Sequence, residues 1–182
     1  MTEETVFIAH LIDVRTKEKA FRELISLYKE RLYWHIRKIV ISHDDTDDVL
    51  QNTFIKIYKN IDKFNQESKL FSWMYRIATN EAITFTNKRA KDRKATVSDI
   101  HEQLASTLES DVYFSGEAIQ NILQKAIATL PQKQQLVFNM KYFDDLKYTE
   151  ISEILKTSVG ALKASYFHAV KKIENYIKMK TD

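Results

Sequence analysis

The chain has 182 residues and a formal net charge of +3, enough length for two small helical domains but too little charge to establish nucleic-acid binding by itself. Two glycines and one proline leave little material for the tight turns of β-hairpins, and apolar residues recur at helical spacing along most of the chain. The sequence therefore predicts an all-α fold.

Several classes of protein are excluded by the residues that the sequence lacks. No cysteine is present, which excludes a disulfide framework and cysteine-ligated zinc. The segment Met1 to Val14 lacks the basic start of a secretory signal, and no apolar run is long enough to cross a bilayer. No phosphate-binding glycine loop, metal-ligand spacing or nucleophile motif is found. We therefore expect a cytoplasmic, non-enzymatic protein without metal, cofactor or membrane insertion.

Two amphipathic helices are predicted first. One spans residues 19–40, with Arg37 outside its apolar stripe, and a break at His43–Asp45 follows. The buried stripe of the second helix is predicted to contain Val49, Leu50, Phe54, Ile57 and Tyr58.

A third helix is predicted over residues 71–88, after a polar loop from Asn65 to Lys69. One of its stripes consists of Trp73, Ile77, Asn80 and Thr84. The amide of Asn80 would be poorly satisfied in a dry core, so we expect it at the surface.

The next stretch has a different composition. Basic residues cluster in Lys88–Lys94, whereas residues 95–120 contain no Lys or Arg and several acids. Because this stretch lacks strong periodicity, we predict a mobile linker with a transient helix around residues 97–108.

A helix-turn-helix is predicted between residues 130 and 176. Pro131 suits the first turn of a helix, because its missing N–H costs nothing there. The apolar residues that follow at helical spacing are Leu136, Val137, Met140 and Phe143. A short helix is predicted over residues 148–155, and Ser158 is expected to cap the last helix.

The last helix has an apolar stripe and an opposite face of small residues, cations and one ring. That face consists of Gly160, Lys163, Ala164, Phe167 and Lys171, flanked by His168 and Lys172. In a helix-turn-helix, the start of this helix meets base edges and later cations meet phosphates. We predict base contacts for Lys163 and His168 and a thymine-methyl contact for Phe167. Lys171 and Lys172 are predicted to neutralise phosphates. The alternative is an ordinary solvated basic face.

Three segments resemble one protein family, the bacterial extracytoplasmic-function (ECF) sigma factors. Region 4 of that family is similar to LPQKQQLVFNMKYFDDLKYTEISEILKTSVGALKASYFHAVKKIE, and region 2 to DDVLQNTFIKIYKNIDKF and LFSWMYRIATNEAITFTNKRAK. The resemblance implies region 2 in residues 1–91, a linker in 92–117 and region 4 in 118–182. It also implies an alternative sigma factor that binds core RNA polymerase and directs promoter recognition and DNA opening.

The resemblance also implies which residues form each interface. By position, contacts with the minus-thirty-five duplex fall on Lys141, Tyr148, Thr149, Lys163, Ala164, Phe167 and His168. The family's usual arginines are replaced here by Ser165, His168 and Val170. Arg pairs bidentately with guanine and His does not, so the family's base preference and affinity are not carried over to this chain. Contacts with the polymerase clamp helices, in the largest subunit, fall on Asp48, Gln51, Asn52 and Phe54. For Phe54 an ordinary core position is the alternative. Region 4 would bind the flap of the second-largest subunit.

The resemblance also implies that the polar loop and the helix after it capture an unstacked base of the non-template minus-ten strand. Such capture requires stacking surface, polar groups and nearby cations. The predicted stacking residues are Phe64, Phe71 and Trp73, each with a core position as its alternative. The predicted polar groups are Asn65, Ser68, Ser72 and Asn80, and the predicted cations are Lys56, Lys69, Arg76, Lys88 and Arg89.

Two other functions are compatible with the sequence alone. A dimeric helix-turn-helix regulator would bind a palindromic duplex without contacting polymerase. A helical adaptor held by an antagonist is partly compatible with the sigma-factor interpretation, because the family's members are commonly sequestered by anti-sigma proteins. Phe167 and Tyr148 are candidate docking points for such a partner.

Overall fold

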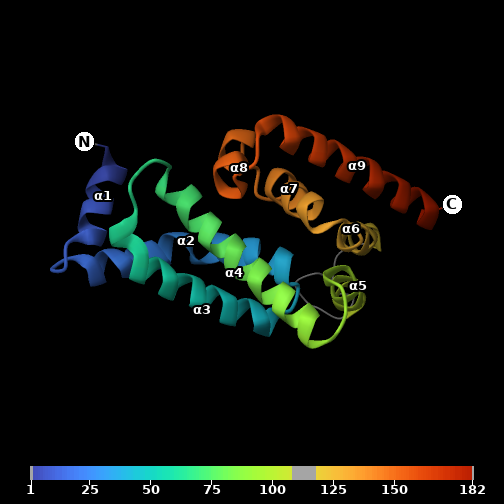
Figure 1. Ribbon diagram of the computed structural model, residues 1–182, viewed down its shortest axis with the longest axis horizontal. Coiled ribbons are helices and arrows are strands. Elements are labelled where there is room, and N and C mark those ends of the chain that lie inside the picture. Colours follow the sequence, from blue (N-terminus) through green and yellow to red (C-terminus); the bar gives the residue numbers. More distant parts are fainter. Residues whose placement is uncertain (1, 108–117, 182) are drawn as a thin grey trace. The chain divides into compact units, whose positions relative to one another are not determined.

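The computed structural model of the protein describes residues 2–107 and 118–181 (Figure 1). These residues form nine α-helices and one 3-10 helix, and no strand is found among them, which confirms the all-α prediction. The chain divides into two compact units. Unit 1 consists chiefly of Met1–Ile83, and unit 2 of Thr84–Ser152 and Lys156–Asp182.

Unit 1 is built around the long helix α2. Its elements are α1 (Glu3–Ile12), α2 (Lys17–Val40), α3 (His43–Asn60), η1 (Ile61–Lys63) and the first part of α4 (Leu70–Asp92). α3 packs along α2, and α1 packs on α2 and η1. α4 is joined to α2 by the buried side chain of Tyr75, whose hydroxyl donates to the carbonyl of Arg31 at 3.3 Å, and by His35 Nε2, which lies 2.8 Å from Thr79 Oγ1.

The helix α1 was not predicted from the sequence. Its ten residues contain only two buried side chains, Ile8 and Leu11, and so short a face gives a weak periodic signal. The side chain of Thr2 caps the helix by accepting a hydrogen bond from Thr5 N at 3.2 Å.

The break between α2 and α3 is shorter than predicted. Ile41 adopts a positive φ of 69°, and Ser42 caps α3 by accepting a hydrogen bond from Asp45 N at 3.5 Å. His43–Asp45, predicted as the break, therefore form the first turn of α3.

Two side chains of unit 1 correct the predicted stripes. Tyr58 is 37% exposed, because its ring lies edge-on against Phe21 (centroids 4.9 Å apart) outside the core. Arg37, predicted outside the apolar stripe, is only 3% exposed. Its neighbours His35 and Ile36 are buried as well, so the C-terminal half of α2 is covered around most of its circumference.

Unit 2 is built around the last helix. Its helices are α5 (Val97–Thr107), α6 (Ala118–Ala128), α7 (Gln132–Tyr142), the larger part of α8 (Tyr148–Leu155) and α9 (Val159–Thr181). α6 and α7 pack on α9, and α5 packs on α6. The buried cluster that joins α6, α7 and α9 contains Ala126, Ile127, Leu130, Phe138, Ala169 and Ile173.

Part of the predicted linker is a packed helix. The helix expected around residues 97–108 is found as α5, with Ile100, His101 and Ala105 buried. Residues 108–117 of the predicted linker lie outside the described residues.

The predicted helix-turn-helix is present, with two corrections. α7 begins at Gln132, so Pro131 precedes the helix instead of occupying its first turn. Leu136, Val137 and Met140 are buried as predicted, but Phe143 lies beyond the end of α7 and is exposed. Phe138 fills the core instead, 4% exposed and stacked on Tyr166 with ring centroids 5.8 Å apart.

Candidate functional site

The outward face of α9 has the geometry predicted for a recognition helix. Its start is fixed by Lys156, which adopts a left-handed φ of 52°, and by the predicted cap Ser158, whose hydroxyl accepts from Ala161 N at 3.3 Å. We call the following exposed residues the recognition face: Gly160, Lys163, Ala164, Phe167, His168, Lys171 and Lys172. The opposite side of the helix carries the buried residues Leu162 and Ala169.

Packing inside unit 2 does not explain the residues of the recognition face. Phe167 is 54% exposed, and the only cation found over its ring among the described residues is Lys171, with Nζ 4.5 Å from the centroid. A Cβ added at Gly160 would meet no atom within 4 Å, so the core does not require a glycine there. The face is therefore open to a large ligand.

Tyr148 lies between two lysines at the start of α8. Nζ of Lys141 is 5.6 Å from the ring centroid and Nζ of Lys163 is 5.9 Å from it. Desolvation, and then the nearby Tyr166, raise the pKa of Tyr148, so its hydroxyl stays a hydrogen-bond donor at neutral pH. Thr149, beside it, is exposed.

Lys141 has a structural contact that the sequence did not reveal. Its ammonium donates to the carbonyl of Leu146 at 3.2 Å and lies 4.0 Å from a carboxylate oxygen of Asp145. Both partners belong to the turn between α7 and α8, so Lys141 holds that turn as well as standing beside Tyr148. No short-range pattern could have shown this, because the contact depends on how the turn folds back.

The predicted strand-capture residues lie on α4 and on the loop before it. Of these, the exposed residues are Asn65, Lys69, Asn80 and Lys88, with Lys56 exposed on α3. The half-buried residues are Ser68, Phe71, Trp73, Arg76 and Arg89. The exposed position of Asn80 agrees with the argument that its amide would be poorly satisfied in a core.

Two predicted capture residues lie in the core. Phe64 is buried and packs against Trp73 with ring centroids 5.2 Å apart, which leaves the half-buried Trp73 as the outer ring of the pair. Ser72 is 1% exposed, so its hydroxyl does not reach the surface. The burial of Ser72 follows from the side of α4 that packs inward, which periodicity alone did not assign.

Two cations near this surface make contacts with residues of a neighbouring helix. Lys56 of α3 forms an ion pair with Glu81 of α4, which offsets part of the positive charge predicted for DNA. Arg31 of α2 was missed as a site residue, yet its guanidinium lies 4.1 Å from the centroid of the Phe71 ring.

Two of the predicted polymerase contacts, Gln51 and Phe54, line a groove between α2 and α3. The groove has a volume of about 440 Å³ and is lined by Phe21, Ile25, Gln51, Phe54, Ile55, Tyr58 and Lys59. An adjoining hollow of about 350 Å³ includes Asp48, and Asn52 is exposed on the same helix. Phe54 is only 8% exposed, so it is a core residue that also lines the groove.

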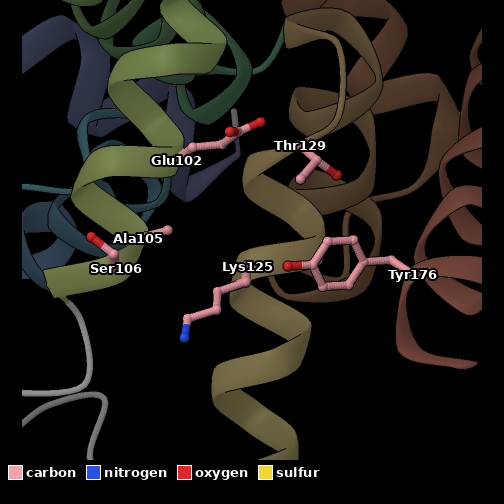
Figure 2. Close-up of a pocket in the computed structure, with 6 residues that line it drawn as sticks. All are labelled: Glu102, Ala105, Ser106, Lys125, Thr129 and Tyr176. Carbon is pink, nitrogen blue, oxygen red and sulfur yellow. The ribbon is translucent and has the colours of Figure 1, made fainter. Parts of the chain in front are cut away.

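A further hollow, of about 370 Å³, lies within unit 2 between α5, α6 and α9 (Figure 2). Its lining consists of Glu102, Ala105, Ser106, Lys125, Thr129 and Tyr176. None of the predicted DNA or polymerase contacts is in this lining.

Two other kinds of site are absent from the part of the chain that the structure describes. No group of three or more His, Asp or Glu side chains is placed to hold a metal ion. No helix among the described residues is both long and apolar enough to cross a membrane.

Comparison with known families matches both halves of the chain. The family model "Sigma-70 region 2" matches residues 24–92, and "Sigma-70, region 4" matches residues 120–173. The ECF RNA polymerase sigma factor SigW of Bacillus subtilis is 33% identical over 155 residues, which cover 80% of this chain and 82% of SigW. This chain belongs to the ECF sigma factor family. It is therefore an alternative sigma factor for transcription initiation, a DNA-binding initiation factor.

Other relatives agree with this assignment. The ECF RNA polymerase sigma-E factor of Escherichia coli K12 is 29% identical over 170 residues, covering 88% of this sigma factor and 87% of that protein. A solved structure of CnrH in complex with the cytosolic domain of CnrY has a TM-score of 0.69 and covers 97% of each chain at 18% identity. The sigma factor RpoE of Bartonella quintana, in complex with the anti-sigma factor NepR, has a TM-score of 0.67, covers 88% of this chain and 98% of RpoE, and is 18% identical. At such identities these two structures support the fold alone.

Proposed function

We propose that this sigma factor divides its task among three surfaces. The groove between α2 and α3 binds the clamp helices of core RNA polymerase, the outer side of α4 captures the non-template minus-ten strand, and the recognition face of α9 reads the minus-thirty-five duplex. The observation that carries this proposal is the recognition face itself, whose residues are all exposed on a helix whose other side is buried.

The chemistry of the recognition face fits a DNA major groove. Small residues at Gly160 and Ala164 allow close approach, and Lys163 is positioned in the first turns, where base edges are met. Lys171 and Lys172 follow about two turns later, where a helix leaving the groove passes the phosphates.

The groove between α2 and α3 fits a helical protein partner. Ile55 is 44% exposed and lies beside Tyr58. Exposure of this apolar surface to water is unfavourable, which is typical of a protein-binding site. Asp48 and Gln51 at its edge supply polar groups that orient a partner.

The outer side of α4 supplies the groups needed to hold an unstacked base. Trp73 offers a partly exposed ring, Asn80 an exposed amide two turns later, and Lys88 an exposed cation beyond it. On this basis we assign region 2 to residues 1–91, the linker to 92–117 and region 4 to 118–182.

Further partners follow from the family. The Bartonella quintana neighbour was solved with an anti-sigma factor, so we propose an anti-sigma protein as a regulator of this chain. From the family resemblance we also propose that region 4 contacts the polymerase flap. We propose the cytoplasm as the location of the protein.

The proposal is tested by size-exclusion chromatography of the full chain with bacterial core RNA polymerase. We expect a one-to-one complex, and we expect Ile55→Asp to weaken it because the charge enters the apolar groove. The matched control is Leu27→Asp, at a position of α2 that is exposed and does not line the groove. A homodimer that elutes apart from competent core, or equal effects of the two variants, would contradict the proposal.

A further inference from the structure

The first turn of α4 makes a hydrogen bond with a residue far away in the sequence. Lys69 precedes the first helical residue, Leu70, and its ammonium cannot accept a hydrogen bond from a backbone N–H. The first turn contains no acidic residue. An acceptor for the backbone N–H groups is required at this end of the helix, and a negative charge there is favourable as well.

Glu4 of α1 supplies both. Its Oε1 accepts a hydrogen bond from Leu70 N at 3.1 Å, although the two residues are 66 positions apart in sequence. Glu4 is held there because α1 is anchored to unit 1 by the buried side chains of Ile8 and Leu11. The contact is thus made by a carboxylate at the positive end of the helix dipole.

The same carboxylate lies near Tyr28 of α2. Burial first, and then the charge of Glu4, raise the pKa of Tyr28. The ring centroids of Tyr28 and Phe71 are 6.4 Å apart. The guanidinium of Arg31 lies over the Phe71 ring. Contacts from α1 and α2 therefore meet at the first turn of α4, where the polar loop ends.

We propose that Glu4 is a positioning residue for strand capture, which fixes the first turn of α4 so that Trp73 and Asn80 present a preformed surface to the minus-ten strand. The inference rests on the proposed function of α4. Glu4 itself does not contact DNA, since its carboxylate would repel phosphate. Its effect passes through the hydrogen bond to Leu70 N.

The test uses holoenzyme assembled from the full chain and a single-stranded oligonucleotide selected for tight binding by the wild-type holoenzyme. We expect Glu4→Ala to weaken binding of this strand by about three- to tenfold, the effect of losing a helix cap. Glu4→Gln should stay within about twofold of wild type, because its amide oxygen still accepts from Leu70 N. The matched control is Glu3→Ala, which removes an equal charge from the same turn of α1 and should leave strand binding unchanged.

Two measurements separate positioning from general stability. Affinity for core polymerase and for duplex selected by region 4 should be the same for Glu4→Ala and wild type. If Glu4→Ala behaves as Glu3→Ala does, or if it weakens core binding as much as strand binding, the inference is wrong. Asn80→Ala tests the underlying proposal separately. If this variant leaves strand binding intact, the function assigned to α4 is wrong. If Asn80→Ala weakens strand binding and Glu4→Ala does not, only the role of Glu4 is wrong.

Discussion

Two phenylalanines of unit 2 separate folding from DNA recognition. Phe138 is buried and Phe167 is exposed. We expect Phe138→Ala to lower the free energy of unfolding by ~3–5 kcal/mol, since it opens a cavity in the core. Phe167→Ala should change stability by less than ~0.5 kcal/mol but weaken binding to promoter duplex. Chemical denaturation and a duplex-binding assay distinguish the two effects. Unchanged promoter binding in Phe167→Ala would remove this ring from the recognition face.

The two lysines beside Tyr148 are expected to respond differently to substitution. Lys141→Ala removes the hydrogen bond to the Leu146 carbonyl and should destabilise unit 2 by ~1 kcal/mol, as well as affecting DNA binding. Lys163→Ala removes an exposed side chain, so promoter use should fall while thermal stability and core binding are retained. Equal losses of stability in the two variants would mean that the contact of Lys141 with the turn is not significant.

The recognition helix, as an element, contains one position where stability and function should oppose each other. Gly160 has a negative φ and open space around it, so Gly160→Ala should stabilise α9 by up to ~1 kcal/mol through helix propensity. If α9 enters the major groove there, the added methyl should weaken duplex binding or leave it unchanged, and should not strengthen it. Thermal unfolding and duplex titration of the same variant measure both effects. A loss of stability would contradict the open environment of this glycine.

The helices differ in how far their own residues specify them. α9 has a capped start and a continuous apolar stripe, whereas α1 is short and has a weak stripe, and it is fixed mainly by the side chains it buries on unit 1. α5 is intermediate, since its helix was expected but its packing on α6 was not. Helices that depend on tertiary packing, such as α1 and in part α5, were the ones that sequence patterns missed or placed incompletely.

At the scale of the whole molecule, the chain has two compact units, each with its own buried residues. We expect calorimetric unfolding to show two transitions. Leu32→Ala, at a fully buried position of α2, should lower the transition of unit 1, and Phe138→Ala should lower that of unit 2. If either variant shifts both transitions equally, the units unfold as one cooperative structure.

The net charge of the whole chain is consistent with a protein that binds DNA through specific surfaces. A net charge of +3 is too small to drive strong general binding to nucleic acid. The cations of the recognition face are instead gathered on one side of a single helix, while Lys56 is paired with Glu81. Specificity therefore depends on where the cations lie more than on their total number.

The sequence by itself determined the all-α fold, the helix-turn-helix with its Ser158 cap, and the two faces of α9. These features depend on neighbours within a few residues, because helical periodicity places such residues on the same face or on opposite faces wherever the helix packs. Its resemblance to region 2 and region 4 also gave the family that the comparisons established.

Only the tertiary structure decided which rings are core and which are surface. Phe138 was missed and Phe143 misplaced, because the end of α7 and its packing on α9 set their burial, not their spacing. The contacts of Glu4 with Leu70 and of Arg31 with Phe71 join segments far apart in the chain. Local patterns carry no information about such pairs, since their proximity exists only after α1, α2 and α4 have packed together.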